Sequence, residues 1–178
     1  MPHVCPSWLS FLLYNPIRKA FTDREEILKE AGISADSVVL EVGAGNGFLT
    51  EALASRAKKV LSLELQAGMI RKLRKRVQRF GDKVEIVIGD IATYRISADF
   101  VDVCLLYYCF HEISNKTDAS KNISRAVKIG GTLSIYEPGI EVNKTDMQKT
   151  IIMFEQLGFK RELERNTIFT KFARLKKI

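Results

Sequence analysis

Three glycines with a carboxylate just before them carry the clearest chemical signal in the sequence. The stretch LEVGAGNGFLTEAL, residues 40–53, holds Glu41, Gly43, Gly45 and Gly47. A glycine-rich turn between a strand and a helix usually cradles phosphate. The dinucleotide pattern G-x-G-x-x-G is broken here by Phe48, and the G-x-x-x-x-G-K-[ST] pattern is absent. A carboxylate would also repel phosphate and attract a cation, so the turn predicts a different ligand.

Two further acids end apolar runs. Glu64 follows the run that starts at Lys59, and Asp90 ends the run that starts at Lys83. At the end of a buried strand, the first acid is placed to accept hydrogen bonds from ribose hydroxyls. The second is placed to accept one from an exocyclic amine. A ligand with a cationic amine, a ribose, a purine and no phosphate fits these groups, and S-adenosylmethionine is such a molecule.

The segment LLYYCFHEIS, residues 105–114, has the residue types for a reaction centre. His111 has an unperturbed pKa of about 6.5, which suits a general base, and Glu112 could orient it or act itself. Tyr107 and Tyr108 predict an aromatic pocket, or one of the two hydroxyls serves as a hydrogen-bonding group. The alternative is that His111 caps the following helix or bonds a backbone carbonyl. Cys109 is expected to be a small pocket residue and not a nucleophile.

Both histidines of the chain lie two positions from a cysteine, as His3 with Cys5 and as His111 with Cys109. Four such nitrogen and sulfur ligands could hold a soft metal if the N-terminal segment folded over the site. The spacing is not that of a zinc finger. The favoured interpretation leaves His3 and Cys5 in a flexible end, and no metal site is assigned.

These residues need a scaffold that brings strand ends together, and the pattern of the chain predicts one. Short apolar runs alternate with amphipathic stretches. The expected strands are 37–42, 59–65, 83–90, 100–108 and 132–138, and the expected helices are 46–57, 67–81, 115–131 and 146–158. The runs 159–165 and 167–175 flank Asn166 as an antiparallel hairpin. The fold class is therefore α/β: a single doubly wound, Rossmann-like domain over 35–178, with a mostly parallel seven-stranded sheet, a C-terminal antiparallel hairpin and helices on both faces. Residues 1–34 are expected to form a helical lid.

The chain resembles the class I S-adenosylmethionine-dependent methyltransferases over about residues 25–176. The family motif [DE]-x-G-x-G-x-G stands complete from Glu41 to Gly47. The resemblance implies cofactor contacts by Glu41, Gly43, Ala44, Gly45, Gly47, Glu64, Leu65, Asp90, Ile91 and Leu106. The segment 105–114 resembles the ubiquinone- and menaquinone-type small-molecule methyltransferases, in which a histidine follows the fourth strand. Neither [DN]-P-P-[YF] nor a Pro-Cys pair is present, so the amino-methylating and 5-methylcytosine patterns are missing.

The leading hypothesis is therefore methyl transfer to a small-molecule acceptor under the N-terminal segment, with carbon, nitrogen, oxygen and sulfur acceptors all open. The net charge of +7, from 28 basic and 21 acidic residues, allows a nucleic-acid partner. One alternative is thus an RNA methyltransferase that uses the basic helix 69–80, and another is a non-catalytic cofactor-binding subunit. Three cysteines at no disulfide spacing suggest a cytoplasmic protein, and no apolar run reaches the roughly 18 residues of a membrane span. The oligomeric state is open.

Overall fold

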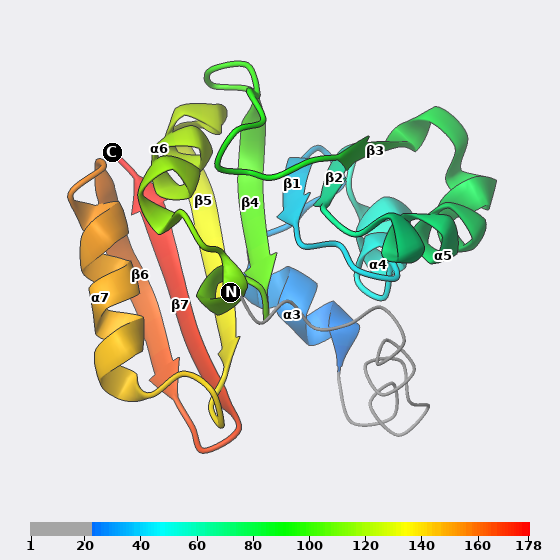
Figure 1. Cartoon of the computed structure of the whole chain (residues 1–178). Helices are drawn as coiled ribbons and strands as arrows, with labels where there is room; N and C mark the ends of the chain where they lie inside the picture. Colours follow the sequence, from blue (N-terminus) through cyan, green and yellow to red (C-terminus); the bar gives the residue numbers. More distant parts are fainter. Residues whose placement is uncertain (1–22) are drawn as a thin grey trace.

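The computed structural model describes residues 23–178 (Figure 1). Most of the expected lid, including His3 and Cys5, lies outside the described residues. The first described helix, α3 (Arg24–Glu30), begins at Asp23, whose side chain accepts a hydrogen bond from the Glu26 backbone N–H at 3.1 Å and caps the helix. It buries its apolar face against the sheet. No helix in the described part of the chain is long and apolar enough to cross a membrane.

One seven-stranded sheet forms the centre of the molecule (Figure 1). Its strands are β1 (Val38–Val42), β2 (Lys59–Glu64), β3 (Val84–Ile88), β4 (Val101–Tyr107), β5 (Val127–Pro138), β6 (Phe159–Asn166) and β7 (Thr170–Lys177). The spatial order is β3-β2-β1-β4-β5-β7-β6, and β7 runs antiparallel to both of its neighbours. The predicted doubly wound fold with a C-terminal hairpin is confirmed. Its order reverses between β1 and β4, where ligands bind in such sheets.

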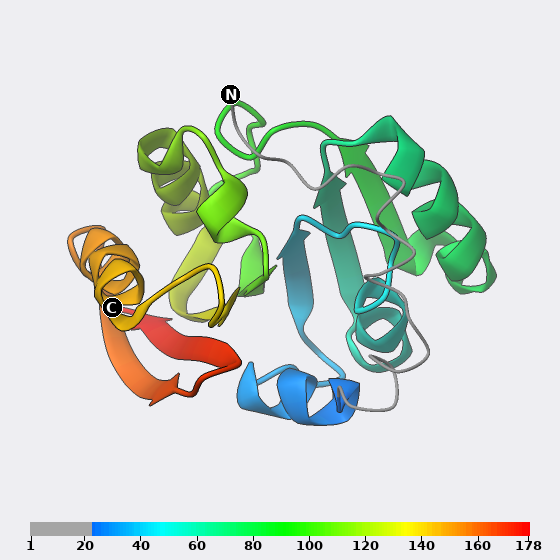
Figure 2. The same ribbon diagram turned by 60° about the horizontal axis from the view of Figure 1, so that its bottom comes forward.

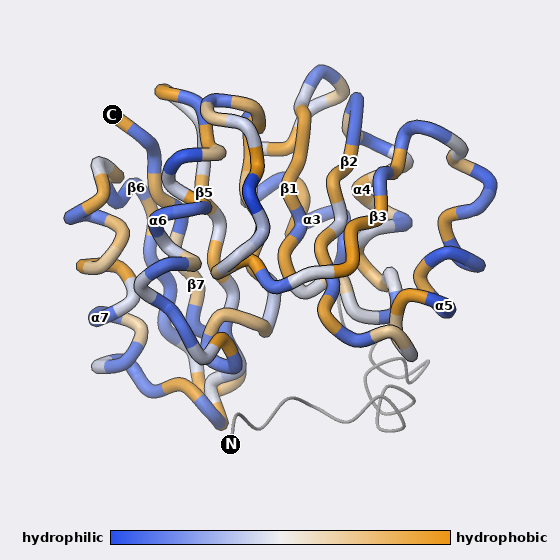
Figure 3. The backbone as a smooth tube through the Cα atoms, turned by 45° about the horizontal axis from the view of Figure 1, so that its top comes forward, coloured by the Kyte–Doolittle hydropathy of each residue, from blue (hydrophilic) through white to orange (hydrophobic). Residues whose placement is uncertain are grey.

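Side-chain alternation along the strands separates two apolar layers. Val39 of β1 and Val103 of β4 face the layer that includes α3 and α4 (Thr50–Arg56). Their neighbours Leu40 and Cys104 face the layer of α6 (Lys116–Ala126) and α7 (Lys144–Glu155). Because successive residues of a strand point to opposite faces, a strand covered on both faces is apolar throughout. Figure 3 shows this pattern, with hydrophobic residues along the central strands.

The remaining helices cover the β3 end of the sheet and the loops. They are α5 (Ala67–Val77), η2 (Gln78–Lys83) and the short η3 (Phe110–Glu112). Helix α5 buries Met69, Ile70, Leu73 and Val77 on its inner face. Helices α6 and α7 each begin at an asparagine side chain, Asn115 and Asn143, that accepts a hydrogen bond from a backbone N–H three residues later.

The predicted helix 115–131 is too long, because α6 ends at Ala126 and β5 begins at Val127. Val127 is fully buried and pairs with Val101, so tertiary packing takes it into the sheet. Gly130, within β5, has a φ of 74°, which suits glycine and cannot continue a helix. Helical periodicity alone did not reveal this change, since Ala126 and Val127 are both apolar.

In Figure 2 the C-terminal hairpin of β6 and β7 lies beside α3, at the bottom of the view. The Glu30 carboxylate accepts hydrogen bonds from the Arg165 guanidinium and from the Tyr136 hydroxyl, the latter at 2.8 Å. Arg174 of β7 donates to the Glu30 backbone oxygen at 2.9 Å. These contacts hold α3 against β5, β6 and β7.

Candidate functional site

A cavity of about 310 Å³ opens where β1, β2 and β4 end. Its described lining comprises Glu41, Val42, Gly43, Ala44, Gly45, Asn46, Phe48, Leu49, Leu63, Glu64, Leu65, Gln66, Met69, Gly89, Asp90, Ile91, Tyr107, Tyr108, Cys109, His111, Glu112, Ile113, Ser114, Pro138 and Glu141. Most of the predicted site residues thus come together. The structure places Gly47 and Leu106 outside this lining, and Leu106 is fully buried in the sheet core.

The three glycines of the turn are needed for two different reasons. All three have positive φ, namely 70° at Gly43, 56° at Gly45 and 84° at Gly47. A Cβ on Gly43 would lie 2.6 Å from the Cys109 Cβ, and one on Gly47 would lie 2.7 Å from Leu73 Cδ1. A Cβ on Gly45 would meet only the Gly43 carbonyl oxygen, at 4.0 Å. Gly43 and Gly47 therefore permit close packing, whereas Gly45 keeps the cavity side of the turn open.

Glu41 is buried below the turn, where it also lines the cavity, and only 3% of it is exposed. Its Oε2 accepts hydrogen bonds from the Thr50 hydroxyl at 2.6 Å and from the Ser62 hydroxyl at 2.8 Å. Burial raises its pKa to about 7, against the opposing effect of those two hydroxyls and with a smaller contribution from the Glu64 charge. A cationic ligand in the cavity would stabilise the ionised form.

Glu64 links the turn to the start of α5. Its Oε2 accepts from the Gly45 N–H and its Oε1 from the Gln66 N–H, both at 2.7 Å. Each oxygen keeps a second lone pair, so the fixed carboxylate can still accept from two hydroxyls. Asp90 in turn accepts from the Ala92 N–H at 2.8 Å. The open side of Gly45 and this oriented carboxylate fit a ribose-bearing cofactor such as S-adenosylmethionine.

On the other side of the cavity, β4 ends in two stacked aromatic rings. The Tyr107 and Tyr108 rings lie 4.3 Å apart at 16°. Tyr108 has a φ of 56°, which is unusual for a non-glycine residue, and its N–H donates to the Tyr136 oxygen at 2.8 Å. Its hydroxyl lies 2.7 Å from the Thr170 Oγ1 of β7. Contacts from β5 and β7 thus hold this aromatic wall in place.

His111 lies between two carboxylates. Its Nδ1 contacts Glu137 Oε2, its backbone N–H donates to Glu137 Oε1 at 3.1 Å, and its Nε2 lies 3.1 Å from Glu141 Oε2. Glu137 is buried, while the Glu141 side chain is 56% exposed. The expected orienting partner was Glu112, but the carboxylates in contact with the ring are Glu137 and Glu141. Lys116 Nζ donates to the His111 backbone oxygen at 3.0 Å and fixes the segment further.

The surroundings shift the pKa values of His111 and Cys109. Burial lowers the pKa of His111, but the hydrogen bond to Glu137 and the charges of Glu137, Glu141 and Glu112 outweigh it and raise the pKa above 6.5. Burial raises the pKa of the Cys109 thiol well above its usual range, and its Sγ donates to the Val42 oxygen at 3.1 Å. Cys109 is therefore a packed thiol and not a ready thiolate. Within residues 23–178, no cluster of side chains suits a metal ion.

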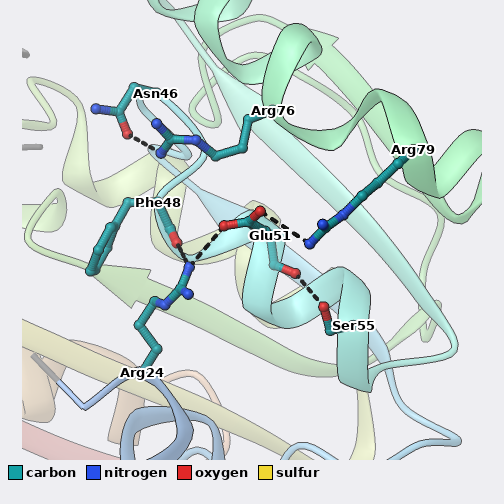
Figure 4. Close-up of polar contacts among 7 residues, drawn as sticks. All are labelled: Arg24, Asn46, Phe48, Glu51, Ser55, Arg76 and Arg79. Carbon is teal, nitrogen blue, oxygen red and sulfur yellow. Dashed lines mark hydrogen bonds and ion pairs between the residues drawn. The ribbon is translucent and has the colours of Figure 1, made fainter. Parts of the chain in front are cut away.

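A charged cluster joins α3, α4 and η2 (Figure 4). The Glu51 carboxylate of α4 pairs with Arg24 of α3 and with Arg79 of η2, each at 3.1 Å. Arg24 also donates to the Phe48 backbone oxygen at 3.0 Å and lies 5.3 Å from the centre of the Phe48 ring. Because Phe48 lines the cavity, this cluster connects α3 to the site.

Glu137 and Glu141 are the charged residues of the site that sequence reasoning did not identify. A signal existed for Glu137, because it ends an apolar run in the same way as Glu64 and Asp90. Glu141 lies in the loop after β5, where no local pattern marks it. Its position is set by backbone hydrogen bonds from Glu141 and Val142 to the Pro138 oxygen, at 3.1 and 2.9 Å.

The basic helix suggested as an RNA surface is α5. Its Arg71, Lys72, Arg74 and Lys75 are exposed, and its apolar face packs against β2 and β3. Only Met69 and the preceding Gln66 reach the cavity. The cationic face therefore points away from the aromatic wall and His111.

Comparisons with known proteins agree with this geometry. A family model described as "Methyltransferase domain" matches residues 40–135. An uncharacterized methyltransferase of Geobacillus sp. (strain WCH70) is 31% identical over 144 residues, which are 80% of this chain and 66% of the relative. The chain thus spans just under two thirds of that relative's length. A probable ribosomal RNA small subunit methyltransferase A of Methanosarcina barkeri (strain Fusaro / DSM 804) is 42% identical over 66 residues, or 37% of this chain and 23% of the relative.

The crystal structure of a SAM dependent methyltransferase from Aquifex aeolicus superposes with a TM-score of 0.81, at 22% identity, over 96% of this chain and 99% of that one. The two proteins therefore share the fold. The family model covers more than half of the chain, including the glycine turn, Glu64, Asp90 and His111. The chain therefore belongs to the methyltransferase domain family, and its fold is that of a class I S-adenosylmethionine-dependent methyltransferase.

Proposed function

We propose that the chain transfers a methyl group from S-adenosylmethionine to a small-molecule acceptor held beside His111. The observation that carries this proposal is one continuous cavity with two unlike walls. The glycine turn, Glu64 and Asp90 form a cofactor wall. Tyr107, Tyr108, His111, Glu112 and Glu141 form an acceptor wall. A cavity of about 310 Å³ is in the range of small-molecule sites.

The cofactor supplies a methyl group activated by its positive sulfur. The chain contributes orientation, since in-line approach of two held reactants accounts for much of the rate in such transfers. It also offers a proton acceptor. Glu137 engages Nδ1 of His111 deep in the fold, so Nε2 is the ring atom that faces the cavity together with Glu141. We assign proton removal from the acceptor to this His111–Glu141 pair, whose Nε2 and Oε2 atoms lie 3.1 Å apart.

An RNA acceptor is the second candidate. It is favoured by the exposed basic residues of α5 and by the ribosomal RNA methyltransferase name of the Methanosarcina relative. Against it, the basic face lies on the side of α5 away from the acceptor wall, and the match to that relative covers 37% of this chain. A non-catalytic subunit is disfavoured by the aromatic wall and the held histidine beside the cofactor wall.

We propose a reducing, cytoplasmic location because the thiols of Cys104 and Cys109 are free.

The test is transfer of an isotope-labelled methyl group from S-adenosylmethionine into a cell extract that is then separated into low-mass, RNA and protein fractions. The expected result is label in the low-mass fraction. Removal of RNA by nuclease should leave that label unchanged. Label confined to RNA, with binding that weakens steeply as salt rises, would establish the second candidate instead. Cofactor binding without label in any fraction would support the non-catalytic alternative.

A further inference from the structure

We propose that the methyl acceptor is an amine, bound as an ammonium group by the aromatic wall and Glu141. This inference rests on the proposed small-molecule function and specifies its substrate class. It starts from the two stacked tyrosines that face the cavity. The ring faces of tyrosine carry negative electrostatic potential and attract cations at short range. Tyr107 and Tyr108 both line the cavity with their rings stacked 4.3 Å apart, and we place the ammonium group against this stack.

The charge of the cavity supports the same class of ligand. Its described lining includes five carboxylates and a single cationic group, His111, with no lysine or arginine. This contrasts with the +7 charge of the whole chain. Glu41, Glu64 and Asp90 belong to the cofactor wall, so Glu112 and Glu141 remain on the acceptor wall. An anionic acceptor such as a carboxylate or a phosphate ester would meet repulsion there.

Glu141 is held where it can meet the acceptor. Gly139 precedes it, and a Cβ at this glycine would lie 2.0 Å from the Ile168 backbone oxygen, so only glycine fits. The Gly139 N–H donates to the Phe169 oxygen at 2.9 Å and ties the loop to the β6–β7 turn. The loop thereby carries Glu141 to within 3.1 Å of His111 Nε2. With His111 shared between two carboxylates, the acceptor wall retains net negative charge even when the ring is protonated.

The transfer then balances as follows. The bound ammonium loses one proton to the His111–Glu141 pair and becomes a neutral amine with a free lone pair. That nitrogen forms a bond to the methyl carbon while the carbon–sulfur bond breaks, and the bonding electrons remain on sulfur as a neutral sulfide. The product is a methylated ammonium ion, and the proton held by the pair passes to solvent water.

Matched probes test this preference without knowledge of the natural acceptor. The protein is loaded with S-adenosylhomocysteine, and its affinities for 2-phenylethylamine, 2-phenylethanol and 3-phenylpropionate are measured by ligand-observed NMR. The three share one aromatic skeleton and differ in the terminal group. The amine should bind at least about tenfold more tightly than the other two, the factor of one charge-assisted hydrogen bond.

Two variants locate the effect. Glu141→Gln should weaken amine binding by about tenfold and leave alcohol binding within about twofold. The matched control is Glu85→Gln, since Glu85 is also a half-exposed, ion-paired carboxylate, 2.9 Å from Lys59, but lies outside the cavity lining. Glu85→Gln should change neither the amine affinity nor the alcohol affinity.

Failure of the proposed function and failure of the amine proposal give different results. If S-adenosylhomocysteine does not bind, the proposed function itself is wrong. If it binds but the alcohol or the carboxylate equals the amine, or if the amine shows no binding, the amine class is overturned while methyl transfer stands. Unchanged amine affinity in Glu141→Gln also overturns the proposal.

Discussion

The two walls of the cavity are built in different ways. The cofactor wall uses backbone: the turn at Gly43 and Gly45 gives its shape, and Glu64 is held by two backbone N–H groups. The acceptor wall uses side chains from distant positions, such as His111 with Glu137, 26 residues apart, and Tyr108 with Thr170, 62 residues apart. A backbone wall is rigid and tolerates little change. A side-chain wall can be altered gradually and responds to pH.

The largest effect should come from Gly45→Val on the cofactor wall. A β-branched residue at a φ of 56° is strained, and its side chain would enter the cavity. Affinity for S-adenosylmethionine should fall by about 10³-fold, roughly the sum of strain of 1–3 kcal/mol and one lost hydrogen bond. Calorimetry measures this. Gly130→Val is the control, since Gly130 has a φ of 74° and open space around it, away from the cavity. Equal loss of affinity in both variants would show that strain alone is responsible.

Next in size is His111→Ala on the acceptor wall. It should lower kcat by about 10²-fold, the lower end of what a general base contributes, with cofactor affinity within a few-fold. Steady-state rates with the best-bound amine, at several pH values, would measure it. Loss of the pH inflection together with the rate indicates proton transfer. A small rate loss with the inflection retained would leave His111 as a structural group and orientation by Tyr107 and Tyr108 as the main contribution.

Glu64→Ala should have a smaller effect, because the glycine turn remains. We expect cofactor affinity to weaken by about 1.5–3 kcal/mol, the scale of hydrogen bonds to a charged group. Calorimetry with S-adenosylmethionine is the measurement, and Glu85→Gln serves as a control outside the cavity. Wild-type affinity in Glu64→Ala would contradict the ribose role.

The smallest effect concerns the acceptor wall again, where the charge of His111 should make the stability of the fold depend on pH. The pKa of His111 is raised above 6.5, mainly by Glu137 against the effect of burial. The His111–Glu137 contact should therefore stabilise the fold fully below pH 6.5 and lose that contribution as pH rises through the folded pKa. NMR titration of the two histidines, with His111→Ala for assignment, would give the value. Glu137→Gln should lower it, and an unchanged pKa would show that Glu137 does not hold the ring.

The same contrast explains what the sequence could predict. The sheet and the cofactor wall follow from local patterns, since Glu41, the glycines and Glu64 each stand at the end of an apolar run. The acceptor wall depends on which loops meet in space, and Glu141 has no local signal. The end of α6 was missed for a related reason, because the burial of Val127 is a tertiary effect.

The burial of Glu41 makes cofactor loading a proton-coupled event. Because burial raises its pKa to about 7, Glu41 gains or loses its proton near neutral pH. The methyl donor carries one more positive charge than the sulfide left after transfer, so it gains more from an ionised Glu41. A fall in pH would therefore shift the competition for the site toward the spent cofactor. Inhibition by the spent cofactor should therefore become stronger as the pH falls, and this requires no change in the acceptor wall.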